Sequence, residues 1–226
     1  MKKLHIFDLD GALLPVDSGD TWPLYLAKEE PGRCGWAEAV SRDFAENEAR
    51  GFFDPVAFAL FNLKLLSLVP RKRLEVLRED FIEGFILPKV SEKAFEIVRK
   101  AKEEGAYTLQ ISGTVAFVSA EIGRRLGIDR ALGVEPARGL DGDFTARMAA
   151  PVTFGVHKVK RLENFLRARG LRAENLEDLR FYTDSDYDLP LIQYVREKGG
   201  RAFALNPNAR LEAFAKDNAL DVIRFY

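Results

Sequence analysis

The second half of the chain alternates short apolar runs with segments of helical periodicity, and this alternation restricts the fold more than any other feature. The apolar runs that predict strands there are residues 107–111, 180–183, 202–205 and 222–225, with a weaker one at 132–135. A further run, residues 4–7, predicts a first strand at the start of the chain. Strands and helices in alternation predict a parallel sheet with crossover helices. We therefore expect an α/β fold with a Rossmann-like parallel sheet core.

A mostly helical stretch of about a hundred residues separates the first strand from the second. The helical pattern runs from about residue 19 to residue 85. An inserted group of helices explains this stretch better than a loop, because structureless loops of that length are uncommon in compact domains. We expect residues 1–16 and 87–226 to form the α/β core and residues 17–86 to form an α-helical cap.

Composition and charge argue against several classes of protein. The 226 residues carry 34 Lys and Arg against 35 Asp and Glu, a net charge of −1 that disfavours a dedicated nucleic-acid binder. The most apolar run, residues 56–69, is shorter than the roughly 20 residues of a membrane span, and the first residues lack the apolar core of a signal peptide. The single Cys34 fits a reducing compartment, and two histidines exclude a multi-histidine metal site. We expect a cytoplasmic protein without nucleic-acid or membrane partners, and its oligomeric state stays open.

Polar residues follow the predicted strands at the sheet edge where parallel α/β proteins bind their ligands. They are Asp8, Asp10 and Gly11 after the first strand, Ser112-Gly113-Thr114 after the second, Lys158 in the helix before the 180–183 strand, and Asp184 and Asp188 after that strand. Several aspartates, a hydroxyl and one lysine would therefore meet at one edge of the sheet.

This set of residues suits a phosphate beside a metal ion. A cluster of aspartates is unfavourable unless a cation neutralises it. Oxygen ligands suit Mg²⁺, which keeps several waters and is shared with phosphate groups. Lys158 supplies a positive charge and Ser112 a donor for phosphate oxygens. The Ser112-Gly113-Thr114 run is also expected to open a helix, whose free N–H groups bind anions.

Simpler explanations exist for each motif taken alone. Asp8 and Asp184 could each begin a calcium loop, but the twelfth positions hold Gly19 and Val195 instead of an acid. The Ser112-Gly113-Thr114 run alone is more often a helix cap, and a lone lysine such as Lys158 is usually solvated. The metal–phosphate prediction depends on all four motifs occurring in order at strand ends.

The same motifs resemble those of the haloacid dehalogenase superfamily. They are Phe7-Asp8-Leu9-Asp10-Gly11-Ala12-Leu13-Leu14, Ile111-Ser112-Gly113-Thr114, Lys158, and Thr183-Asp184-Ser185-Asp186-Tyr187-Asp188-Leu189-Pro190. Asp17-Ser18 with Trp22, the Leu126-Gly127-Ile128 helix end and the 205–211 segment resemble the phosphoserine-phosphatase-like branch. This resemblance spans nearly the whole chain and is weakest over residues 30–85.

The resemblance implies a phosphatase that forms an aspartyl-phosphate. Asp8 would be the nucleophile, and Asp10 would protonate the leaving alcohol and then activate water. Asp8, the backbone carbonyl of Asp10, and Asp184 would bind Mg²⁺. The remaining roles are those of Asp188, which would bind the metal through water or orient its neighbours, and of Ser112, Gly113 and Lys158, which would hold the phosphoryl oxygens.

The chain departs from the family pattern at several positions. Ala12 stands where the family usually has threonine, and Thr183 where it usually has glycine. Asp17 stands at about the position of the acidic residue that phosphoserine phosphatases use for the amino-acid end of the substrate. A count along the predicted cap places Leu60 where their arginine would be, so phosphoserine is less favoured than another phosphomonoester.

We expect Asp17 and Trp22 to line the substrate pocket. Five apolar side chains of the predicted cap recur at helical spacing and are expected to form its core rather than to touch substrate. They are Phe52, Phe53, Phe58, Phe61 and Leu65.

The expected function is Mg²⁺-dependent hydrolysis of a small phosphorylated metabolite. Two alternatives remain on the same fold: a phosphotransferase with the same covalent chemistry, and a non-catalytic protein that binds a phospholigand. The retention of every chemical group named above argues against the second alternative.

Overall fold

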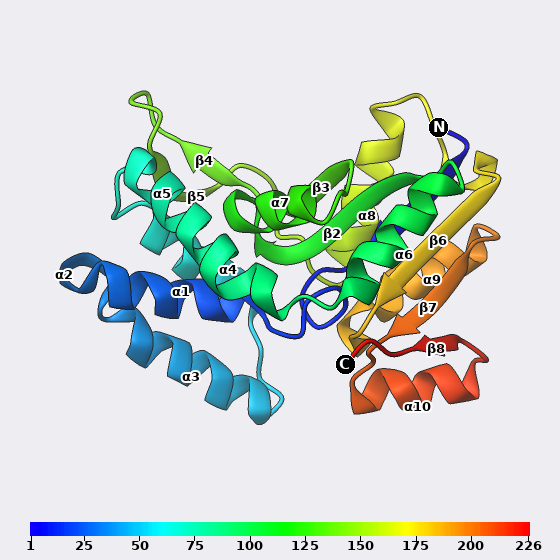
Figure 1. Cartoon of the computed structure of the whole chain (residues 1–226), viewed down its shortest axis with the longest axis horizontal. Helices are drawn as coiled ribbons and strands as arrows, with labels where there is room; N and C mark the ends of the chain where they lie inside the picture. Colours follow the sequence, from blue (N-terminus) through cyan, green and yellow to red (C-terminus); the bar gives the residue numbers. More distant parts are fainter.

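The computed structural model describes all 226 residues, and a six-stranded parallel sheet forms its centre (Figure 1). The strand order is β3-β2-β1-β6-β7-β8. The strands are β1 (Lys3–Phe7), β2 (Tyr107–Val115), β3 (Arg130–Val134), β6 (Asp178–Thr183), β7 (Arg201–Leu205) and β8 (Asp221–Ile223). The predicted parallel α/β core is therefore confirmed.

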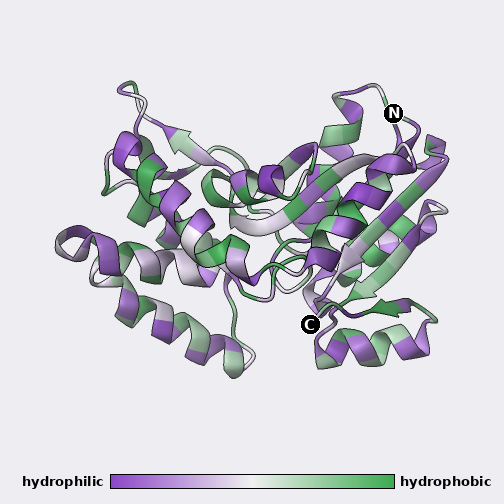
Figure 2. Cartoon of the chain, in the orientation of Figure 1, coloured by the Kyte–Doolittle hydropathy of each residue, from purple (hydrophilic) through white to green (hydrophobic).

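Helices cover both faces of this sheet because the central strand alternates its apolar side chains. Leu4 and Ile6 of β1 pack in one core cluster, and Phe7 packs in the other. The first cluster contains buried residues of α8 (Val156–Arg167), α9 (Leu189–Glu197) and α10 (Ala209–Asp217). The second contains buried residues of α6 (Glu92–Glu103) and α7 (Ala116–Arg125). Hydrophilic and hydrophobic residues are interleaved along the helices, as expected for elements with one buried face (Figure 2).

Five helices lie between β1 and the helix that leads into β2, and Figure 1 shows them beside the sheet rather than on it. They are α1 (Ser18–Glu29), α2 (Pro31–Cys34), α3 (Ala37–Ala49), α4 (Pro55–Leu66) and α5 (Arg71–Phe81), followed by a π-helical turn at Ile82–Ile86. A hairpin of β4 (Pro136–Arg138) and β5 (Phe144–Met148) packs against α4. The backbone N–H of Arg71 also donates to Asp143 Oδ1 over 2.8 Å.

The end of β2 differs from the sequence expectation. Strand β2 continues to Val115 and α7 begins only at Ala116, so Ser112, Gly113 and Thr114 end a strand instead of opening a helix. The backbone N–H of Thr114 donates to Ser112 Oγ over 3.0 Å. This short side-chain bond occupies the N–H that a helix start would have offered to an anion.

The predicted apolar core of the helical insert is only partly correct. Phe61 and Leu65 of α4 are buried, as expected. Phe58 lines a cavity and also packs against the core, next to Phe61. Phe52 is 74% exposed, and Phe53 lines the cavity instead of filling the core. Helical spacing fails here because Phe52 and Phe53 precede α4, so the periodicity of that helix does not apply to them.

None of the helices combines the length and the apolarity that crossing a membrane would require.

Candidate active site

A cavity of about 240 Å³ lies at the carboxyl ends of β1, β2 and β6, the edge predicted from the motifs. Its lining holds seven carboxyl groups and a single basic side chain, Lys158. The acids are Asp8, Asp10, Asp17, Asp20, Glu48, Asp184 and Asp188. The cavity therefore carries a large excess of negative charge.

Lys158 joins two of these acids, which come from distant parts of the chain. Its Nζ lies 2.8 Å from Asp8 Oδ2 and 2.9 Å from Asp188 Oδ2, and its side chain is almost fully buried. Burial disfavours the charged form of Lys158, but the carboxylates of Asp188 and Asp8 raise its pKa above the ordinary value. The lysine therefore stays protonated at the bottom of the cavity.

Asp8 is fixed at both carboxylate oxygens. Its Oδ1 accepts the backbone N–H of Leu9 over 2.8 Å, and its Oδ2 accepts from Lys158. Burial raises the pKa of Asp8, and Lys158 opposes this shift. Both hydrogen bonds favour the ionised form of Asp8 and fix the orientation of its carboxyl group.

Thr183, which departs from the family pattern, also takes part in the site. Its Oγ1 donates to Asp188 Oδ2 over 2.7 Å, and both residues are buried. The hydroxyl and Lys158 together hold one oxygen of Asp188, and the other oxygen, Oδ1, has no partner.

Asp10 accepts hydrogen bonds at both of its carboxylate oxygens from two segments. Ser18 donates its backbone N–H over 2.8 Å and its Oγ over 2.6 Å to Oδ1. Thr114 Oγ1 donates to Oδ2 over 2.7 Å, and Ser112 Oγ donates to the same oxygen over 3.3 Å. The orientation of this carboxyl is therefore set jointly by the end of β2 and the start of α1.

Asp184 follows β6 and fits closely against Gly11. A side-chain carbon at Gly11 would lie 2.1 Å from Asp184 Oδ2, and Gly11 has a φ of +73°, so only glycine is suited to this position. Asp184 Oδ1 is buried without a partner. Desolvation by burial, with the charges of Asp188 and Asp10, raises the pKa of Asp184 to about 7 against the opposing effect of Lys158.

The two unpartnered oxygens fit a divalent cation. Asp184 Oδ1 and Asp188 Oδ1 are buried acceptors without donors, and a buried acceptor without a partner is unfavourable. Together with Asp8, these carboxylates make an all-oxygen donor set of the kind that Mg²⁺ prefers. The residues present therefore fit the expected metal ion.

The structure places most of the predicted site residues together, with two differences. Gly113 and Asp17 line the cavity, whereas Ser112 is buried behind it and contacts Asp10. Trp22, predicted to line the pocket, is fully buried, and its ring packs against Tyr25 and Phe81. The prediction for Trp22 is wrong because α1 turns this side chain into the core.

Sequence reasoning missed several residues of the cavity. Thr114 was given no role of its own, although its place two residues after Ser112 in the same strand was a usable signal. Asp20 and Glu48 lie on solvated helices among other charged residues and gave no local signal. The remaining missed lining residues with polar or aromatic side chains are Phe154, Ser185, Tyr187 and Asn208.

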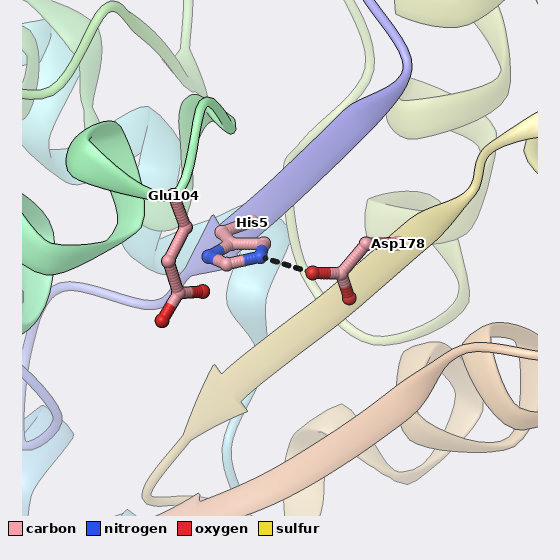
Figure 3. Close-up of side chains that lie close together, drawn as sticks. All are labelled: His5, Glu104 and Asp178. Carbon is pink, nitrogen blue, oxygen red and sulfur yellow. Dashed lines mark hydrogen bonds and ion pairs between the residues drawn. The ribbon is translucent and has the colours of Figure 1, made fainter.

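A second acidic cluster, His5 with Glu104 and Asp178, lies away from this cavity (Figure 3). His5 Nε2 pairs with Asp178 Oδ2 at 3.1 Å. Arg180 already neutralises both carboxylates, at 3.0 Å from Glu104 and 2.7 Å from Asp178. This cluster is therefore an ion-pair network that supports the sheet.

A family model described as haloacid dehalogenase-like hydrolase matches residues 6–193. Since the match spans most of the chain, the chain belongs to the haloacid dehalogenase-like hydrolase family, as its motifs predicted. Within that family it is a phosphatase-type enzyme.

The most similar curated relatives include two phosphatases. A histidinol-phosphatase from Neisseria meningitidis serogroup C (strain 8013) is 32% identical over 225 residues and is matched over 100% of both chains. Phosphoserine phosphatase SerB1 from Mycobacterium tuberculosis (strain ATCC 25618 / H37Rv) is 30% identical over 152 residues. That match covers 67% of this chain and 47% of the relative, so the aligned part is about half of the relative's length.

Solved structures show the same fold. The crystal structure of a protein with unknown function from Bordetella pertussis Tohama I has a TM-score of 0.92, 30% identity and coverage of 100% of both chains. A substrate-bound phosphoserine phosphatase has a TM-score of 0.66 at 21% identity, and the match covers 99% of this chain and 93% of that one. The second comparison supports the fold alone.

Proposed function

We propose that this protein hydrolyses a small phosphate monoester with the help of Mg²⁺, through a phosphorylated Asp8. The observation that carries the proposal is the position of Lys158, which hydrogen-bonds both Asp8 and Asp188. Beside it, two buried carboxylate oxygens, Asp184 Oδ1 and Asp188 Oδ1, have no partner. Asp8, Asp184 and the backbone carbonyl of Asp10 would bind Mg²⁺, with Asp188 beside them. When bound, the metal would neutralise charge on the phosphoryl oxygens.

In the first half of the reaction, an Asp8 carboxylate oxygen attacks phosphorus and the bond to the ester oxygen breaks. The Asp10 carboxyl gives its proton to the leaving alkoxide, and the alcohol departs. Lys158 and the Gly113 segment hold the phosphoryl oxygens in place during this step. Ser18 and Thr114 keep Asp10 in one orientation, which favours proton transfer along one direction.

In the second half, the Asp10 carboxylate takes a proton from a water molecule, whose oxygen attacks the phosphorus of phosphorylated Asp8. The bond between phosphorus and Asp8 breaks, and inorganic phosphate leaves. Asp8 returns as a carboxylate and Asp10 as a carboxyl, so the cycle is closed without any other reactant. The helices of residues 17–86 would act as the cap over this chemistry.

Histidinol phosphate is the first substrate to test. The Neisseria relative named histidinol-phosphatase matches this chain from end to end, whereas the relative named phosphoserine phosphatase matches over 47% of its own length. The cavity lining contains no arginine for the carboxylate of phosphoserine. Leu60, which stands where that arginine was expected, is not among the lining residues either.

The proposal is tested by phosphate release from a panel of phosphomonoesters, with Mg²⁺ and with a chelator. We expect turnover with Mg²⁺, its loss on chelation, and a loss of several orders of magnitude in Asp8→Asn, which lacks the nucleophile. Asp186→Asn is the matched control, because Asp186 lies in the same loop as Asp184 but pairs with Asn208. Full activity of Asp8→Asn, or of the chelated enzyme, would contradict the proposal.

A further inference from the structure

Three carboxyl groups of the cavity take no part in the metal and phosphate sites proposed above. Asp17 and Asp20 lie at the start of α1, and Glu48 lies near the end of α3. Asp17 Oδ1 accepts the backbone N–H of Asp20 over 2.9 Å and so caps α1. The side chains of Asp20 and Glu48 line the cavity and make no hydrogen bond or ion pair.

Three aromatic side chains, Phe53, Phe154 and Tyr187, line the same cavity and form an aromatic wall. Phe53, from the connection between α3 and α4, has its ring centroid 5.4 Å from that of Phe154 and 6.1 Å from that of Tyr187. Phe154 and Tyr187 are 4.9 Å apart. The wall therefore joins one residue of the helical insert to two residues of the α/β core.

The carboxylates and the aromatic wall face the same space. Asp20, Glu48, Phe53 and Tyr187 all line this one cavity. Desolvation by burial, and then the charges of Glu48 and Asp10, raise the pKa of Asp20 to about 6.

The cavity is short of positive charge even with its proposed metal. Lys158 is its only basic side chain, against seven carboxyl groups. One divalent cation would be largely balanced by the phosphate dianion that it binds. The unpaired acids Asp20 and Glu48 would then still lack a counter-charge.

We infer that the alcohol part of the substrate carries a cationic nitrogen, held by Asp20 and Glu48 beside the rings of Phe53 and Tyr187. The inference rests on the proposed function and assigns its specificity. A protonated amine or a flat cationic ring gains charge-assisted hydrogen bonds from the acids and cation–π attraction from the rings. A carboxylate on the same part of the substrate would be repelled, so an amino alcohol phosphate is preferred over its amino acid counterpart.

Three phosphate esters distinguish the effect of a cationic group on hydrolysis from the effect of a ring. Histidinol phosphate carries the cation and a ring, phosphoserine adds a carboxylate beside the amine, and 4-nitrophenyl phosphate has a ring without a cation. The quantity to measure is the ratio of kcat/KM for histidinol phosphate to kcat/KM for 4-nitrophenyl phosphate. We expect this ratio to fall about tenfold in Glu48→Gln and in Asp20→Asn, because each loses one charge-assisted contact.

Glu46→Gln is the matched control. Glu46 lies two residues before Glu48 on α3, outside the cavity, and pairs with Arg50 at 3.7 Å. Its substitution should leave the ratio unchanged. An unchanged ratio in both Glu48→Gln and Asp20→Asn, or equal hydrolysis of histidinol phosphate and phosphoserine by the native enzyme, would overturn the inference.

A binding measurement tests the inferred cation site without depending on the proposed hydrolysis. Calorimetric titration with histidinol, which has the cation but no phosphate, requires no turnover. We expect weaker binding to Glu48→Gln than to the native protein, and equal binding would overturn the inference. If no ester is hydrolysed, the proposed function fails. If 4-nitrophenyl phosphate is hydrolysed without any preference for the cationic ester, only the specificity fails.

Discussion

Lys158 donates a hydrogen bond to Asp8 over 2.8 Å, although 150 residues of chain separate them. The same Nζ bonds Asp188, so one buried cation balances two buried carboxylates. A buried ion pair of this kind is a weak source of stability, but removing one partner leaves an uncompensated charge. The arrangement therefore couples the folding of the sheet edge to the chemistry proposed for Asp8.

Replacing Lys158 by methionine should reduce both activity and stability. We expect a loss of about 3 kcal/mol in the free energy of unfolding, measured by denaturant titration with a chelator present, because Asp8 and Asp188 lose their counter-charge. Added Mg²⁺ should restore part of that loss. Lys160→Met is the control, since Lys160 is exposed on the same helix. Equal stability of the two variants would contradict this account of Lys158.

Replacing Thr114 by valine should slow turnover without weakening substrate binding. The substitution removes the 2.7 Å hydrogen bond to Asp10 Oδ2 and leaves the shape of the side chain nearly unchanged. We expect kcat to fall about tenfold with little change in KM, because a misplaced proton donor affects the chemical step. Thr114→Ser, which keeps the hydroxyl, should retain most of the activity. A rise in KM alone would assign Thr114 to binding instead.

Removal of Mg²⁺ should lower the melting temperature. A ligand that binds only the folded state stabilises it by about 2.7 kcal/mol when its concentration is a hundred times its Kd. Differential scanning calorimetry with Mg²⁺ and with chelator measures the difference. We expect Asp184→Asn to abolish the difference and Asp186→Asn to keep it. A melting temperature of the native protein that is the same with Mg²⁺ and with chelator would argue against the metal site.

Asp20→Asn should stabilise the protein at neutral pH. Desolvation by burial, with the charges of Glu48 and Asp10, raises the pKa of Asp20 in the folded chain to about 6, above its unfolded value of 3.8. The folded state binds this proton more tightly, so the native protein loses stability as the pH rises from about 4 to about 6. Asparagine does not titrate.

The melting temperature of Asp20→Asn should therefore exceed that of the native protein at about pH 8, and the two should converge at about pH 4. Specificity should change over the same range. The preference of the native enzyme for a cationic ester should weaken below about pH 6, where Asp20 gains its proton. A constant difference in melting temperature across the pH range would show that Asp20 does not titrate as described.

Much of the core and of the cavity at the sheet edge could be predicted because strand ends are visible in the sequence. Asp8 and Asp184 directly follow predicted strands, Asp10 lies two residues after Asp8, and parallel strands bring their carboxyl ends to one edge. Lys158 is predictable only as part of an ordered set of motifs, since nothing in the local sequence separates a buried helix lysine from a solvated one. Thr183 departs from the family pattern, and its hydrogen bond to Asp188 could not be predicted from any sequence pattern.

The part of the cavity next to the helical insert was mostly not predicted, for a physical reason. Its residues are placed by packing between the helical insert and the core, so their positions depend on contacts between distant segments. Glu48 is one acid among several on an exposed helix, and Phe53 meets Phe154 about a hundred residues later in the chain. Trp22 lies close to the first motif in sequence, but its side chain faces the core.

The most direct test of the central claim is the detection of phosphate on Asp8 during turnover. The enzyme is mixed with substrate and Mg²⁺, quenched in acid within the first turnover, digested and analysed by mass spectrometry. We predict a phosphorylated peptide that contains Asp8, absent in Asp8→Asn and accumulating in Asp10→Asn if breakdown of the intermediate is slowed more than its formation. Turnover by the native enzyme without phosphate on Asp8, or with phosphate on another residue, would contradict the account.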